Sequence, residues 1–194
     1  MYTQHEKDEL IKAMVGILYS LDKLPVFMCV GVDKVVLDSL APIVSNLLTK
    51  KYNIPAFIYG SLEYNITAKN LVYAKNFIDI MHPKHKVIII DATIGEYDEV
   101  GKVKVVHGGV VPAVYSLDNP KSMGDYAILG VVGTTGIRGK IVLNNTSMQL
   151  VLQMAEFIAE CISKAIDKVL MLKEYENGKI YSIIWCLYLV LTLT

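Results

Sequence analysis

Residues 86–92 read KVIIIDA, the most apolar of the predicted strands and one that ends next to a carboxylate. Four consecutive β-branched residues, 87–90, are typical of a strand buried on both faces, as the strands of a parallel sheet are. Asp91 then follows, and a carboxylate at the end of such a strand is costly unless it is hydrogen-bonded, metal-bound or protonated. This stretch therefore predicts both a central strand and a candidate functional residue.

Similar apolar runs alternate with helical patterns along the chain. The predicted strands cover residues 25–31, 54–60, 86–92, 102–108 and 126–133. The predicted helices cover residues 5–20, 38–51, 66–81 and 144–168. The alternation indicates βαβ units, whereas the period-two strand 102–108 follows its predecessor closely and is expected to be antiparallel. The fold class is therefore α/β: a three-layer α/β/α domain with a mainly parallel, mixed central sheet.

This pattern divides the chain into an N-terminal helix (1–23), an α/β domain (24–170) and a C-terminal tail (171–194). Within the tail, the 15 residues from Ile180 to Thr194 carry no charge. They fall short of the roughly 20 that a helix needs to span a bilayer. Their β-branched and aromatic content suits a buried strand or a partner-covered edge. A packed strand or helix, an oligomer contact and a membrane tail remain alternatives.

The composition narrows the classes of function. Hydrophobic residues make up 53% of the chain and charged residues 20%, which excludes a disordered protein. Because 19 Lys and Arg balance 19 Asp and Glu, a nucleic-acid partner is disfavoured. Residues 1–13 carry charges of both signs and do not resemble a signal peptide, and the three cysteines form no CxxC pair. We expect a cytoplasmic protein with reduced thiols.

Two acidic residues are predicted at the carboxyl edge of the sheet. Asp38 opens the helix after the first strand, and Asp91 ends the third strand. In doubly wound sheets the ligand site lies at this edge, where the strand order reverses. Asp38 is equally a good helix N-cap. Paired carboxylates can share a proton and activate water, hold a metal with a third ligand, or anchor loops.

Other candidate motifs are weaker. Gly130 opens a glycine-rich stretch that lacks a Walker lysine, and no GxGxxG follows the first strand, so no nucleotide cofactor is expected. Ser39 and Ser61 lack a GxSxG setting, which argues against a serine nucleophile. His107, in an HGG sequence after the edge strand, is a surface or core residue unless it completes a metal site with Asp38 and Asp91.

A series of short motifs resembles a known family. Gly31-Val32-Asp33-Lys34, followed by Asp38-Ser39-Leu40-Ala41-Pro42, resembles the signature of the YyaC-type sporulation proteins, which are relatives of the spore germination protease. Further matches follow in order at Tyr59-Gly60-Ser61-Leu62, Ile90 to Gly95, Val100-Gly101, Val110 to Ala113, Gly130-Val131-Val132 and Leu143 to Thr146. The resemblance covers roughly residues 24–166. Lys34, Leu37 and Ala41 depart from the pattern and make the first loop bulkier.

The resemblance implies a phosphorylase/hydrolase-like fold shared with the germination protease and the hydrogenase-maturation proteases. It implies an endopeptidase that cleaves small acid-soluble spore proteins in the forespore or spore core, with Asp38 and Asp91 as the catalytic pair. Asp33 is then a supporting acid, and the residues expected to line the cleft are Ser39, Thr93, Gly133 and Thr134. The expected partners are a protein or peptide substrate and further copies of the chain, with no membrane and no cofactor. The alternatives are a non-catalytic spore binding or assembly protein and a nickel-recognising maturation-type protease.

Overall fold

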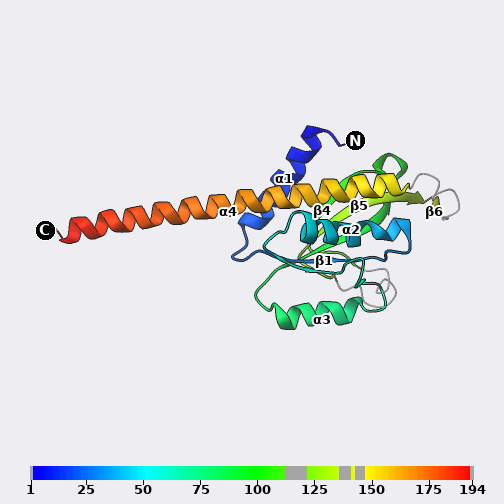
Figure 1. The fold of residues 1–194 in the computed structure, drawn as a ribbon, viewed down its shortest axis with the longest axis horizontal. Coiled ribbons are helices and arrows are strands. Elements are labelled where there is room, and N and C mark those ends of the chain that lie inside the picture. Colours follow the sequence, from blue (N-terminus) through cyan, green and yellow to red (C-terminus); the bar gives the residue numbers. More distant parts are fainter. Residues whose placement is uncertain (1, 112–121, 136–140, 143–146, 193–194) are drawn as a thin grey trace.

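A mixed sheet forms the centre of the computed structural model, which describes residues 2–111, 122–135, 141–142 and 147–192 (Figure 1). Its strands are β1 (Val26–Cys29), β2 (Phe57–Tyr59), β3 (Val87–Gly95), β4 (Val103–His107), β5 (Tyr126–Thr135) and β6 (Ile141–Val142). The order is β2-β1-β3-β5-β4, with β6 paired to β5. β1, β2, β3 and β5 run parallel, whereas β4 and β6 are antiparallel to β5. The predicted α/β class and the antiparallel edge strand are confirmed.

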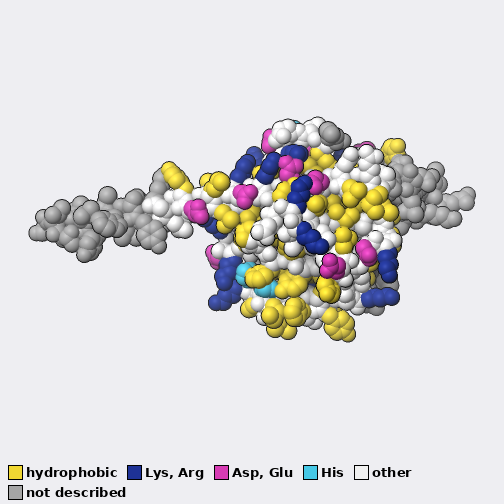
Figure 2. All heavy atoms as spheres, in the orientation of Figure 1, with side chains coloured by type: hydrophobic (Ala, Val, Ile, Leu, Met, Phe, Trp, Pro, Cys, Tyr) yellow, Lys and Arg dark blue, Asp and Glu magenta, His cyan; other side chains and the backbone are white. Residues whose placement is uncertain are grey.

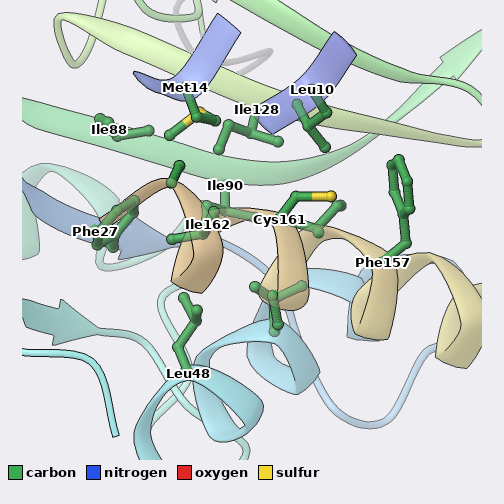
Figure 3. Close-up of a cluster of buried hydrophobic side chains, with 14 of the residues drawn as sticks. Leu10, Met14, Phe27, Leu48, Ile88, Ile90, Ile128, Phe157, Cys161 and Ile162 are labelled. Atoms are coloured by element: carbon green, nitrogen blue, oxygen red, sulfur yellow. The ribbon is translucent and has the colours of Figure 1, made fainter. Parts of the chain in front are cut away.

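Helices cover both faces of this sheet. α1 (Gln4–Tyr19), α2 (Leu40–Asn46) and α4 (Met148–Thr192) lie on one face, and α3 (Leu71–Met81) lies on the other (Figure 1). Successive side chains of β3 point to opposite faces of the sheet. Ile88 and Ile90 therefore pack with α1, α2 and α4, whereas Ile89 packs with α3. Figure 3 shows Ile88, Ile90 and Ile128 of the sheet facing Met14 of α1 and Ile162 of α4.

One glycine sets how closely the helices approach the sheet. A methyl group added at Gly130 of β5 would lie 2.2 Å from Leu40 Cδ2 and 2.4 Å from Met154 Sδ. A side chain at this position would therefore force the buried ends of Leu40 in α2 and Met154 in α4 to move. α1 belongs to the same core, since its buried face joins that of α4.

The segment predicted as one helix over 38–51 is divided into three parts. It begins as a 3₁₀ turn (Val36–Ser39), continues as α2, and ends as a π turn (Leu47–Lys51). The helix predicted over 66–81 begins at Leu71, because Asn70 accepts a hydrogen bond from the Thr67 amide at 2.7 Å and closes a turn before it.

α4 is longer than the sequence pattern indicates. The predicted caps at 144–146 lie outside the described residues, and the Ser147 hydroxyl accepts from the Leu150 amide at 3.1 Å. The helix runs without a break to Thr192, so the strand alternative for the tail is wrong over residues 180–192. No proline occurs after residue 120, and a single Gly178 does not end a helix. Within the described part of the chain, no helix is long and apolar enough to cross a membrane.

Candidate functional site

A cavity of about 610 Å³ opens at the carboxyl edge of the sheet, at the point between β1 and β3 where the strand order reverses. Its walls come from residues 30–32 after β1, from the middle of β3, and from Leu129 of β5. Thr67, Ala68 and Leu71 at the start of α3 form a second wall, and Val106 with residues 109–111 forms a third. Its volume is in the range of small-molecule and peptide sites, roughly 300–1,000 Å³. Asp38 and Asp91 both line it, and its described lining contains no Lys, Arg or His.

Asp38 reaches the cavity because the chain turns tightly after β1. Gly31 has a φ of +151°, and a methyl group there would lie 2.0 Å from the Asp38 carbonyl oxygen. The Val32 amide donates to that same oxygen at 3.1 Å, so the 3₁₀ turn rests directly on the end of β1. Asp38 is the third residue of this turn and its side chain is exposed at the cavity rim. The N-cap alternative is therefore wrong: Ser39, not Asp38, precedes α2.

Asp91 lies deeper in the cavity than Asp38. It alternates with Ile90 along β3, so it points to the α3 side of the sheet, and it is only half-buried. Its Oδ1 accepts a hydrogen bond from the Ala92 amide at 2.8 Å. Burial raises the pKa of Asp91 to about 7, and the negative charge of Asp38 adds to this effect, whereas the Ala92 amide opposes it. Asp91 therefore keeps its proton to a much higher pH than an ordinary aspartate does.

The structure brings only one of the other predicted cleft residues to this cavity. Thr93 lines it, two residues after Asp91 along β3. Ser39 is buried and its hydroxyl donates to the Val36 carbonyl oxygen at 2.8 Å, inside its own turn. The remaining residues lie outside the described lining: Asp33 is exposed in the loop after β1, and Gly133 and Thr134 are buried in β5.

His107 cannot complete a metal site with the two aspartates. It ends β4 and pairs with Tyr126, the first residue of β5, whereas Asp91 pairs with Leu129. Because β4 is antiparallel, its end lies about 10 Å further along the strands and about 10 Å across them from Asp91. The predicted set of Asp38, Asp91 and His107 is therefore wrong. Within the described residues, no other group of three His, Cys, Asp or Glu side chains is arranged to hold a metal.

Leu37 and Ala41, two larger residues that depart from the family pattern, do not line the cavity. Ala41 is fully buried in the core, and Leu37 packs against the same core. The walls that sequence reasoning missed are Thr67 and the apolar residues 109–111. The isolated bridge between Val110 and Met123 positions the second of these walls, and no local sequence pattern marks that pairing.

The comparison with known proteins supports the family resemblance that the sequence motifs indicate. The family described as "Protein of unknown function (DUF1256)" matches residues 1–161, which includes α1 as well as the sheet. The uncharacterized protein YyaC of Bacillus subtilis (strain 168) is 32% identical over 138 residues, which are 71% of this chain and 67% of that protein. The chain therefore belongs to the DUF1256 family and is a protein of the YyaC type.

Proposed function

We propose that the chain is an endopeptidase in which Asp38 and Asp91 share the catalytic work. The observation that carries the proposal is the half-buried Asp91 carboxyl, whose pKa is raised to about 7 in a cavity that Asp38 also lines. Two acids whose environments differ in this way can act as a proton donor and a base at the same pH.

The proposed reaction uses both carboxyl groups. The Asp38 carboxylate takes a proton from water, whose oxygen attacks the scissile carbonyl carbon, while protonated Asp91 donates its proton to the carbonyl oxygen. The resulting gem-diol collapses when Asp38 passes its proton to the leaving nitrogen and the C–N bond breaks. Asp91 then recovers a proton from a gem-diol hydroxyl, which restores the starting state and releases an acid and an amine.

Two features support a polypeptide as the substrate. The cavity is open at its rim, where Asp38 lies, and most of its other lining residues are apolar. The absence of cationic side chains from its described lining disfavours phosphorylated or other strongly anionic ligands. With the family resemblance, these features lead us to propose small acid-soluble spore proteins as substrates and the forespore or spore core as the location.

A digestion experiment tests this proposal. The purified chain is incubated with a mixture of small acid-soluble spore proteins, and the product masses are read. We expect discrete fragments from the wild type and none from Asp91→Asn or Asp38→Asn. Asp98→Asn is the matched control, because the Asp98 side chain is 82% exposed and does not line the cavity, and it should cleave as the wild type does. Activity that survives Asp91→Asn would overturn the mechanism.

One observation favours a non-catalytic binding protein as the second candidate. Acid pairs that share a proton lie about 3 Å apart, yet within the described residues no hydrogen bond joins Asp38 to Asp91, and Asp38 is exposed. In this candidate function the cavity holds a spore-protein segment without cleaving it. Intact substrates that co-elute with the folded chain would support this function and exclude the peptidase.

A further inference from the structure

α3 carries two apolar stripes, although a helix that lies on a sheet needs only one. The inner stripe includes Leu71 and Ile78, which are buried against the strands. The outer stripe consists of Tyr73, Phe77 and Ile80, whose spacings of four and three residues place them on one helix face. These three side chains are 76%, 51% and 76% exposed. A helix that is apolar on both sides is typical of one that is covered on both sides.

The outer stripe is part of a larger patch. Met81 extends it along α3, and Phe57 extends it onto the edge strand β2, where its ring packs on His82 with centroids 4.1 Å apart. We call the set formed by Phe57, Tyr73, Phe77, Ile80 and Met81 the outer α3 patch. Figure 2 shows apolar side chains gathered over α3, at the bottom of the view, close to histidine side chains.

The outer α3 patch lies at the upper end of the size range of apolar patches on monomeric proteins, and it contains no charged side chain. Its five side chains are 49% to 76% exposed, and they present on the order of 600 Å² to solvent at about 200 Å² for each fully exposed side chain. This equals the largest apolar patches of monomeric proteins, roughly 300–600 Å². Lys75 and Asp79 neutralise each other at 2.6 Å within the helix, so an approaching apolar surface meets no unpaired charge from them.

We propose that the outer α3 patch binds a second copy of this chain, with the two α3 helices packed antiparallel about a two-fold axis near Phe77. Tyr73 and Met81 lie at equal distances along the sequence on either side of Phe77, so the stripe is complementary to its own rotated copy. Two such patches, if completely covered, bury about 1,200 Å², which exceeds the roughly 1,000 Å² that a specific interface requires. β2 is the last strand at its end of the sheet, so no further strand among the described residues blocks the approach.

This dimer goes beyond the proposed peptidase and does not depend on it. The contact lies on the outer side of α3, whereas the aspartate cavity is lined by Thr67, Ala68 and the buried Leu71 at the start of this helix. An inactive protein would therefore still dimerise, and an active one would keep Asp38 and Asp91 within a single copy.

The mass of the full-length chain in solution, measured by light scattering over a wide range of concentrations, tests the proposal. We expect twice the chain mass for the wild type, and the mass of one chain for Tyr73→Glu and Ile80→Glu. Each substitution places a charge at two symmetric apolar contacts and should raise the dimer dissociation constant by at least about 100-fold. Tyr97→Glu is the matched control, because Tyr97 is 73% exposed on the turn after β3, and it should leave the dimer intact.

Two outcomes would overturn the proposal. A wild type that stays monomeric at every concentration would show that the outer α3 patch does not bind a second copy. A dimer that survives both Tyr73→Glu and Ile80→Glu would show that the contact lies elsewhere on the chain. Circular dichroism of each variant excludes misfolding as the cause, which is not expected because both substituted side chains are largely exposed.

Discussion

Replacing Asp91 by asparagine removes the ionisation of the carboxyl group on which the proposed site depends. The folded state holds this proton up to a pKa of about 7, whereas the unfolded chain releases it near pH 3.8. Between these values the folded state binds one proton more, so the free energy of unfolding falls by about 1.4 kcal/mol for each pH unit. Over about three units the loss reaches about 4 kcal/mol, an upper bound because Asp91 is not fully buried. The stability of Asp91→Asn should not fall in this way as the pH rises, because asparagine has no carboxyl proton to release.

Urea denaturation of the wild type and of Asp91→Asn at several pH values measures this difference. We expect the two proteins to converge near pH 4 and the variant to become the more stable as the pH rises, with the gap constant above about pH 8. Asp38→Asn should keep most of the wild-type pH dependence, because burial raises the pKa of Asp91 more than the charge of Asp38 does. A gap between wild type and Asp91→Asn that stays flat from pH 4 to 8 would refute the reasoning.

Two glycine substitutions test the packing that positions the site. Gly130→Ala should destabilise the fold by about 1–3 kcal/mol in urea, because its methyl group would lie 2.2 Å from Leu40 Cδ2. Gly16→Ala is its control, since nothing lies within 4 Å of the added methyl in α1, and it should stabilise by about 0.5–1 kcal/mol. Gly31→Ala should displace the turn that carries Asp38, since its methyl group would lie 2.0 Å from the Asp38 carbonyl oxygen. It should abolish peptidase activity at temperatures where circular dichroism still shows a folded protein, and full activity in that variant would contradict the geometry.

The sheet and its reversal point could be predicted because short-range patterns determine them. Each parallel strand is a brief apolar run, and the period-two strand at 102–108 is the antiparallel edge. The meeting of Asp38 and Asp91 in one cavity follows from this topology, because the carboxyl ends of parallel strands share an edge. The same rule excludes His107, since the end of an antiparallel strand lies at the opposite edge.

The features that could not be predicted depend on the direction of side chains and on contacts between distant parts of the chain. Local sequence patterns do not specify either of these. Ser39 precedes α2 at the site, yet its hydroxyl turns back to the Val36 carbonyl oxygen. The tail at 180–192 is helical although its β-branched and aromatic content favours a strand, because it continues a helix that is already packed on α1. The pattern over residues 66–81 predicts the helix α3, but its outer apolar stripe was not predicted, because which side chains face the sheet depends on the structure.

The antiparallel bridge between Val110 and Met123 fixes the two ends of the chain segment between them. The bridge holds Val110 in place as a cavity wall whatever the length of that segment. The closure entropy of a loop grows only slowly with its length, so insertions or deletions there should change stability little. A change of length between the two bridged residues should therefore leave the Val110 wall, Asp38 and Asp91 in place. The shape of this wall and the length of the segment behind it are thus independent of each other.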